Sequence, residues 1–414
     1  MSQRERRAMD DLPYVPELAG PAHSWTRLDG VDLLRGLAIF LVLMNHVNMR
    51  LLGAGIPYTK GLPKQLVISL VWNGQFGVQI FFAVSGFLIT STALRRWGSP
   101  ALVNIRQFYL LRFARIAPLL MTLLAVLSIL HFAHVENFVV SAKAGGLGRA
   151  LIAALTFHVN VLEARRGYLP GSWDILWSLS VEEMFYLFFP LTCRLFGRGK
   201  MLVAILVAFV VLGPFGRTVL AHGNGVWQEY SYVGGMDAIA LGCLTALFLA
   251  SHHSSLSRFI RPVIWVVGGL GGALIIFSLC FSMQAGKWGL GHNGLDMSII
   301  ALGACMVIAA AAETQWRSPR VVTPLLLLGR RSYEVYLTHM FVVLGLFSLF
   351  VSAGKPVAAV SVLFIVVIII SGLAGELVAR FYSEPMNRWI RSRFGDGPGK
   401  LGSVIEAPRV RAGR

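Results

Sequence analysis

Long runs of apolar residues, separated by short polar segments, make up most of the chain from residue 31 onward. A helix needs about 20 apolar residues to cross the hydrocarbon core of a bilayer, and most of these runs reach that length. The predicted fold is therefore an all-α integral membrane protein, a bundle of ten transmembrane helices. The pattern predicts the spans at residues 31–52, 74–94, 109–134, 174–196, 201–220, 233–250, 262–283, 296–313, 333–352 and 357–381.

A weaker run at residues 148–163 could add an eleventh span, but it is short and contains His158 and Asn160. Cytoplasmic segments of membrane proteins are enriched in Lys and Arg, so the basic residues decide the count. Ten spans put most basic segments on the side of the N terminus, whereas an eleventh would move every basic segment after residue 166 outside. We therefore expect both termini in the cytoplasm and a re-entrant or interfacial helix at 148–163 on the outer side.

Composition and charge agree with this organisation. The chain has 414 residues, of which 56% are apolar and 14% charged, which excludes an ordinary soluble domain. The net charge of +17 gathers beside the predicted spans, so it reflects topology and does not indicate nucleic-acid binding. The cysteines stand singly in apolar runs, which predicts neither disulfides nor a metal site. The expected division is a cytoplasmic tail (1–28), a transmembrane domain (29–394) and a disordered basic tail (395–414).

The first predicted helix carries two ionisable residues at depth, Arg35 and His46. They are eleven residues apart, so they point to nearly the same side and are separated by about 16 Å along the helix axis. Ionisable groups inside a membrane are costly and normally face a bundle interior or a polar cavity. The alternative is that Arg35 reaches the headgroups and His46 only bonds a neighbouring helix.

The next two helices carry small and basic residues. Ser85 and Gly86 lie in an aromatic-rich segment, where they indicate either close helix packing or room for a slender acyl chain. Arg112 and Arg115 share one face at the cytoplasmic end of the third helix. Together with Arg35 they would suit the phosphates of a donor such as acyl-coenzyme A, because guanidinium groups bind phosphate bidentately.

The fourth helix contains adjacent carboxylates, Glu182 and Glu183, inside an apolar run. Neighbouring helical residues point about 100° apart, so we expect different partners for the two, one of them an arginine such as Arg115. Ser178 lies four residues before Glu182 on the same face, and Trp177 offers an aromatic surface suited to sugar or acyl contacts.

The ninth helix adds an intramembrane histidine, His339, either a packing group or a substrate contact. A histidine beside a carboxylate is the minimum for general-base catalysis on a hydroxyl group. With a phosphate-binding region on the inner side, this favours acyl transfer from a cytoplasmic thioester to an alcohol. The same groups would also serve a proton-coupled transporter or flippase, and the residues alone leave both functions open.

Six segments, taken together and in order, are more specific than any one of them: Arg35–x10–His46, FFAVSGFLIT (81–90), RFARIAP (112–118), WSLSVEEMFYL (177–187), YEVYLTH (333–339) and SEP (383–385). Through these segments the chain resembles the membrane-bound acyltransferase-3 family from about residue 28 to 395. These bacterial enzymes O-acylate surface glycans and some secondary metabolites, so the resemblance favours the enzyme over the transporter. Two departures, Gln79 and Thr338, stand where relatives often carry an acidic and an aromatic residue.

The resemblance implies an O-acetyltransferase-like enzyme of the bacterial inner membrane, with ten spans and both ends inside. It implies that His46 is the catalytic base, Glu182 its partner or a structural acid, and Arg35, Arg112 and Arg115 donor-side groups. The donor would be acyl-CoA, most simply acetyl-CoA, without a metal. We expect Ser85 on the donor path, and Trp177, Ser178, Glu183 and His339 near a glycan or glycosylated acceptor. Some relatives carry an additional esterase-like domain after the membrane part. The residues after 395 are too few for one, so we expect this chain to act alone or with a separate periplasmic partner.

Overall fold

The computed structural model describes residues 28–252 and 261–395, and all of their regular secondary structure is helical. Within these residues, nine helical segments are long and apolar enough to cross a membrane: 29–53, 74–97, 105–132, 200–217, 225–251, 262–280, 295–314, 332–352 and 357–394. The predicted span at 174–196 is also a helix, α9 (Leu176–Phe196), which is not among these nine. Residues 1–27 and 396–414, where we expected the two tails, lie outside the described residues.

The long helices match the predicted spans closely in position. They are α2 (Asp29–Gly53), α4 (Gly74–Trp97), α5 (Ile105–Phe132), α9, α10 (Lys200–Arg217), α12 (Tyr232–His252), α13 (Arg261–Cys280), α15 (Leu295–Thr314), α17 (Ser332–Ser352) and α18 (Val360–Val378). Short helices connect them: α3 (Lys64–Val71), α6 (Gly146–Leu155), α7 (Val159–Arg166), α8 (Gly171–Asp174), α11 (Gly225–Tyr230), α14 (Ser282–Lys287) and α16 (Thr323–Arg330).

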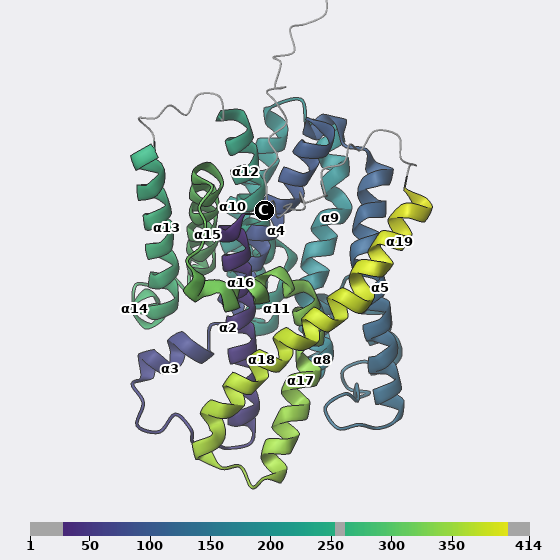
Figure 1. Cartoon of the computed structure of the whole chain (residues 1–414), viewed down its shortest axis with the longest axis vertical. Coiled ribbons are helices and arrows are strands. Elements are labelled where there is room, and N and C mark those ends of the chain that lie inside the picture. Colours follow the sequence, from purple (N-terminus) through teal and green to yellow (C-terminus); the bar gives the residue numbers. More distant parts are fainter. Residues whose placement is uncertain (1–27, 253–260, 396–414) are drawn as a thin grey trace, which may run out of the picture.

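Figure 1 shows the long helices side by side, with α2 and α4 in the interior and α13 at one edge. The most apolar stretches of α2 and α4 are each 67% buried, whereas that of α13 is only 17% buried. The exposed faces are rich in Leu, Val, Ile and Phe, as expected of surfaces that contact lipid tails. The ionisable residues of α2 therefore lie on one of the two helices that are most enclosed by protein.

The Ser85–Gly86 segment brings α4 and α12 into close contact. A Cβ atom on Gly86 would lie 1.9 Å from the carbonyl oxygen of Ile239, and one on Gly242 would lie 2.0 Å from that of Ala83. Only glycine permits such an approach of two helix backbones. The structure thus shows close helix packing at Gly86, where α12 fills the space beside the glycine.

The weak run at 148–163 is not one helix but two short ones, α6 and α7. The helical conformation breaks between them at Phe157, whose φ is 56°. Helix α6 has 10 residues and α7 has 8, and at about 1.5 Å per residue neither could cross a bilayer core of about 30 Å. The expectation that this segment does not span the membrane as a helix agrees with these lengths.

The last long rod, which crosses the bundle diagonally in Figure 1, changes helical type partway. Helix α18 passes into a π-helical turn, η6 (Ala379–Ser383), and then into α19 (Glu384–Phe394). Within the turn, the Tyr382 hydroxyl contacts Thr122 Oγ1 at 2.7 Å and donates to the Pro118 carbonyl at 3.2 Å, both on α5. Immediately after it, Glu384 pairs with Arg331. The π turn thus allows one rod to make both contacts.

Candidate active site

Helix α2 presents Arg35 and His46 to the same neighbour, α17. Arg35 Nε donates a hydrogen bond to Ser332 Oγ at 3.0 Å, at the start of α17. Seven residues further along α17, the His339 ring lies 5.1 Å from the His46 ring, centroid to centroid. The prediction that Arg35 and His46 point to one side is therefore confirmed. The later residue of α2 contacts the later residue of α17, so the two helices run in the same direction.

The His339 ring is held in one tautomer. Its Nδ1 lies 2.7 Å from the Tyr336 carbonyl oxygen, and a carbonyl only accepts, so Nδ1 carries the proton. Nε2 is therefore left as a hydrogen-bond acceptor. The side chain is fully buried, and Nε2 has no partner among the described residues. A buried acceptor without a donor, beside a second imidazole, is a place where a hydroxyl group could bind.

Glu182 is surrounded by hydroxyl groups. The Ser85 hydroxyl donates to Glu182 Oε1, and the Tyr186 hydroxyl donates to the same oxygen at 2.9 Å. Ser85 and Tyr186 also contact each other. The predicted site residues Ser85 and Glu182 therefore meet, across α4 and α9, whereas the ring contact described for His46 is with His339.

The second glutamate of the pair, Glu183, binds an arginine. Arg112 Nη2 donates to Glu183 Oε1 at 3.2 Å, and the Arg112 guanidinium lies over the Tyr186 ring, 3.7 Å from its centroid. Arg112 Nε has no acceptor among the described residues. The expectation that Glu182 and Glu183 have different partners is confirmed, and Arg112 retains an unused donor.

The sequence suggested that Arg115 pairs with a glutamate of α9, and the structure shows a different partner. Its Nη1 lies 3.0 Å from Glu334 Oε1 in the first turn of α17, and its guanidinium lies 5.0 Å from the Tyr333 ring centroid. The reason is the orientation of α5, which turns Arg112 toward α9 and Arg115 toward α17. Spacing of three residues puts two side chains on one broad face without fixing which neighbour each contacts.

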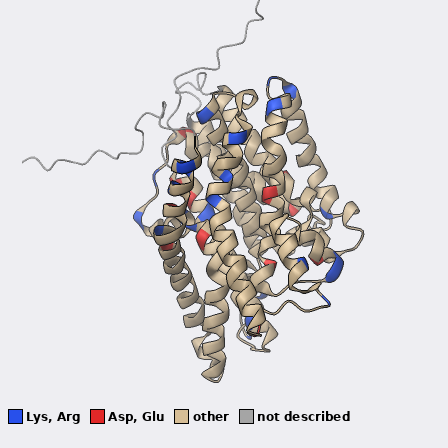
Figure 2. Ribbon diagram, turned by 90° about the vertical axis from the view of Figure 1, so that its right-hand side faces the viewer, with Lys and Arg blue, Asp and Glu red and all other residues tan. Residues whose placement is uncertain are grey.

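The three arginines, Arg35, Arg112 and Arg115, form what we term the basic cluster. The charges of Arg115, Glu334 and Glu182 all act on the Arg35 guanidinium, which places these groups close together. Arg35, Arg112 and Arg115 keep 21%, 25% and 33% of their side-chain surface exposed, respectively. Figure 2 shows basic and acidic segments side by side partway along the bundle. The cluster thus remains accessible at the end of α2 that carries Arg35.

Trp177 and Ser178 lie on the other side of the histidine pair, at the start of α9. The Trp177 ring stacks on Tyr230 with centroids 4.0 Å apart and planes 5° apart. Ser178 Oγ contacts the Tyr336 hydroxyl at 2.6 Å, and Tyr336 also holds His339 through its carbonyl oxygen. Ser178 is therefore connected to the histidine pair through Tyr336, which the sequence analysis did not single out.

Two more carboxyl groups lie near this end and were also missed. Glu163 on α7 is fully buried, and the Leu169 N–H donates to its Oε1 at 3.0 Å. Asp174, at the end of α8, accepts a hydrogen bond from the Tyr230 hydroxyl at 3.2 Å. Burial raises the pKa of Glu163 well above its usual range and that of Asp174 to about 6. A buried asparagine and glutamate in a short apolar run, Asn160 and Glu163, were the available signal.

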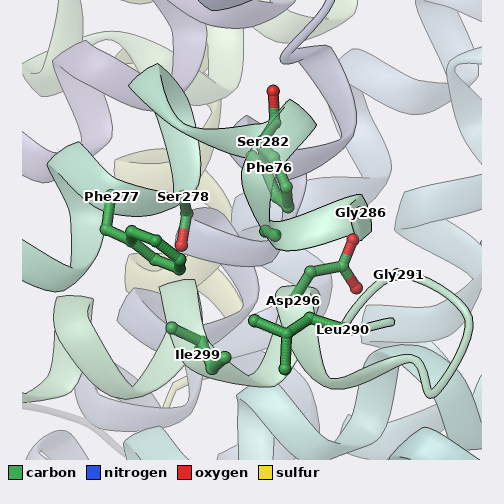
Figure 3. Close-up of a pocket in the computed structure, with 10 residues that line it drawn as sticks. Phe76, Phe277, Ser278, Ser282, Gly286, Leu290, Gly291, Asp296 and Ile299 are labelled. Carbon is green, nitrogen blue, oxygen red and sulfur yellow. The ribbon is translucent and has the colours of Figure 1, made fainter. Parts of the chain in front are cut away.

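A small cavity elsewhere in the bundle contains none of the predicted site residues. It has a volume of about 50 Å³ and is lined by α4, α13, α14, α15 and the loop before α15. Figure 3 shows Phe277 on one side of it and Asp296 on the other. A space of this size suits a few water molecules and is far too small for a nucleotide-bearing donor.

Comparison with known proteins identifies the family. The chain matches the acyltransferase-3 family, described as an acyltransferase domain, over residues 28–376. It is 24% identical over 394 residues to O-acetyltransferase OatA of Staphylococcus aureus strain NCTC 8325, an alignment that covers 92% of this chain and 61% of the relative. The OatA of strain MRSA252 is 24% identical over 372 residues, covering 87% of this chain and 57% of the relative. The chain thus spans less than two thirds of these relatives, and no solved structure matches it. The match over most of the sequence shows that this chain belongs to the acyltransferase-3 family.

Proposed function

We propose that this protein is a membrane O-acyltransferase. It moves a short acyl group, most simply acetyl, from cytoplasmic acyl-CoA to a hydroxyl group of a sugar-containing acceptor. The observation that carries the proposal is the position of the His46–His339 pair, with the basic cluster at one end and a group of hydroxyl, aromatic and carboxyl side chains at the other. The family match and the relatives named O-acetyltransferase support the reaction class.

The proposed topology has ten spans with both termini in the cytoplasm. Helices α2 and α17 run in the same direction, so an odd number of crossings must separate them if both span the membrane. Counting α9 gives seven: α4, α5, α9, α10, α12, α13 and α15. Omitting α9, or adding a span at 148–163, would make the number even. The helix directions thus support α9 as the tenth span. We propose that the bundle lies in the cytoplasmic membrane.

The basic cluster is proposed to bind the phosphates of the donor. Each of its arginines has an acidic or hydroxyl partner that orients it, yet each remains partly exposed. Guanidinium groups held in this way can grip phosphate oxygens bidentately with little further loss of side-chain freedom. Ser85 and Glu182 lie beside the cluster, where the pantetheine arm would pass toward His46.

In the proposed reaction His46 is the general base. Its neutral imidazole accepts the proton of the acceptor hydroxyl while the oxygen attacks the thioester carbonyl. The carbon–sulfur bond then breaks, and the proton passes from the imidazolium to the departing thiolate, so the products are the ester and free coenzyme A. His339, which offers an unoccupied acceptor at Nε2, holds the hydroxyl beside His46.

The test uses purified protein in lipid nanodiscs, acetyl-CoA labelled in the acetyl group, and cell-envelope glycan extracted from a strain that lacks this gene. We expect label in the glycan together with release of coenzyme A. His46→Ala should lower both rates by about 10²–10⁴-fold, the usual worth of a general base. Transport of a proton or solute that survives His46→Ala, without thioester turnover, would replace the enzyme by a transporter.

A further inference from the structure

A second group of polar side chains lies one helical turn beyond His46 on α2. Arg50 follows His46 by four residues, which places it on the same face and about 6 Å further along the axis. Its charge acts on both His46 and Asp174, so it lies between the histidine pair and the carboxyl groups of α7 and α8. This is the end of the histidine pair opposite to Arg35.

The backbone around Arg50 is shaped to receive it. A Cβ atom on Gly171 would lie 2.7 Å from Arg50 Nη2, so the glycine at the start of α8 makes room for the guanidinium. Arg50 Nη1 donates to Asn137 Oδ1 at 3.1 Å, in the loop between α5 and α6. Arg50 is still only half-buried, and the remaining donors of its guanidinium are available to a ligand.

Glu163 and Asp174 form a carboxyl pair opposite Arg50. Glu163 Oε2 is buried and has no N–H or O–H donor among the described residues, and the Asp174 carboxyl is within hydrogen-bonding reach of Glu163. Two carboxyl groups can hydrogen-bond only if a proton lies between them, and their raised pKa values favour this. The pair then carries one negative charge, and Asp174 is only half-buried.

Aromatic side chains line the approach to this pair. Tyr230 holds Asp174, is stacked on Trp177, and meets the edge of Tyr168 at a centroid distance of 5.9 Å. Tyr168 is 58% exposed, so the group opens to the surrounding medium. Aromatic rings beside carboxylate and guanidinium groups form the kind of surface that binds sugars, because ring faces pack on C–H groups while charged groups bond hydroxyls.

The buried Nε2 atom of His339 is independent evidence for a hydroxyl-bearing ligand. It is an acceptor without a donor among the described residues, 5.1 Å, ring to ring, from His46. A polyol supplies the missing donor at His339 and places a second hydroxyl one helical turn away, at Arg50. A monosaccharide is large enough to reach both.

We propose that Arg50, Asp174 and Glu163 form the binding subsite for the sugar acceptor. This inference rests on the proposed function. One acceptor hydroxyl lies at the His46–His339 pair for acylation, while a neighbouring hydroxyl bonds between the Arg50 guanidinium and the Asp174 carboxylate. Glu163 positions Asp174 by sharing a proton with it, and Tyr168 packs on the sugar ring.

The experiment separates binding from chemistry. Binding of the extracted glycan to nanodisc-embedded protein is measured by calorimetry, in a His46→Ala background that cannot turn over. Steady-state kinetics with acetyl-CoA are measured in the otherwise native protein. The variants are Asp174→Asn and Gly171→Ala, whose added Cβ would press on Arg50 Nη2 and, less closely, on Met340 Cε. Glu136→Gln, an exposed acid in the α5–α6 loop, is the matched control.

We expect Asp174→Asn to weaken glycan binding at least tenfold and to raise the KM for glycan by a similar factor. The KM for acetyl-CoA should change less than twofold. Gly171→Ala should weaken glycan binding three- to tenfold, and Glu136→Gln should not. Tyr230→Phe is the substitute variant if Asp174→Asn proves unstable. It removes the hydrogen bond to Asp174, keeps the stack on Trp177, and should also weaken glycan binding.

Two results would overturn the subsite. One is glycan binding that is equal with and without the Asp174→Asn change. The other is a lower kcat and a higher KM for acetyl-CoA while the KM for glycan is unchanged, as expected of a structural cluster. Failure of the proposed function is recognised separately, because then the native protein transfers no acetyl label to any glycan.

Discussion

Two arginine sites in this bundle have opposite characters. Arg217 on α10 uses all of its N–H groups: it donates to the carbonyl oxygens of Gly234 and Gly294, to both oxygens of Asp237 and to Ser298. Only 5% of the Arg217 side chain and none of the Asp237 side chain is exposed. The basic cluster is different, since its arginines stay 21–33% exposed and Arg112 Nε has no acceptor among the described residues.

The difference teaches how to separate structural from ligand-binding arginines in a membrane protein. An ionisable group inside the bilayer needs a reason to be there. The Arg217–Asp237 pair joins α10, α12 and α15 and leaves no donor for anything else, so its role is fully explained by packing. The partners of the basic cluster orient its arginines but leave part of each guanidinium exposed. A phosphate-bearing donor would bind to this exposed part.

The largest effect is expected when the Arg217 site is broken. Asp237→Ala would leave Arg217 buried without a counter-ion, which costs about 3–5 kcal/mol. We expect a large loss of folded protein, measured by thermal unfolding in detergent. Arg317→Gln is the control, because Arg317 is 69% exposed and lies 4.0 Å from Asp29. Its removal should change the free energy of unfolding by less than about 1 kcal/mol.

Arg115→Lys tests the other side of the comparison. Lysine keeps the charge but loses the planar guanidinium, so the KM for acyl-CoA should rise about tenfold while the unfolding temperature stays near that of the native protein. The measurement is initial rate against acetyl-CoA concentration at saturating glycan. An unfolding temperature that drops as far as in Asp237→Ala would assign Arg115 to the structural class and contradict the comparison.

A smaller effect is expected from Glu334→Gln. The change removes the charge that orients Arg115 but leaves its guanidinium in place, 3.0 Å from the former carboxylate oxygen. We expect the donor KM to rise a few-fold, and the double variant with Arg115→Lys to be less impaired than the sum of the two changes. Such non-additivity is the signature of residues that act through one contact. Independent effects would mean that Glu334 has another role.

The smallest effect is a dependence of the unfolding temperature on pH. It is expected from Asp174, which among the described residues lacks the close arginine partner that Asp237 has in Arg217. Burial raises the pKa of Asp174 from 3.8 to about 6, and the groups that face it are Glu163, Glu229, Tyr230 and Arg50. Because the folded-state pKa is the higher one, this carboxyl stabilises the fold below about pH 4, and that contribution is lost as the pH rises through about 6.

The unfolding temperature of the native protein should therefore fall from pH 4 to 7 more than that of Asp174→Asn. The KM for glycan should move the opposite way and increase as the pH is lowered through 6, since the ionised carboxylate binds the acceptor. Parallel pH profiles in the two proteins would show that Asp174 does not titrate in this range.

Much of the fold was predictable, because the length of each apolar run reports on a helix directly. The α-helices lie within a few residues of the predicted ranges, and the common direction of Arg35 and His46 followed from helical geometry alone. The pairing of Arg115 was not predictable. Its partner Glu334 lies 219 residues away, and periodicity says which face a residue occupies without saying which helix meets that face.

The same limit applies to the side chains around Arg50. Arg50, Asp174 and Glu163 come from three segments that meet only because residues 148–163 fold as two short helices rather than one. The positive φ at Phe157 sets that bend, and no strong turn signal such as Gly or Pro marks it in the sequence. Glu182 and Glu183, by contrast, were recognisable as separate in role because adjacent helical positions diverge by about 100°.

The π-helical turn at 379–383 gives the closing rod one place where its length can change without loss of register. It accommodates one residue more than an α-helix would over the same stretch, so deleting a single residue there would restore ordinary helix and leave Glu384 facing Arg331. The same deletion within α18 or α19 would rotate everything after it by about 100°. Two deletions that look alike in an alignment would thus differ in effect, because only the one outside the π turn would break the contacts of the rod.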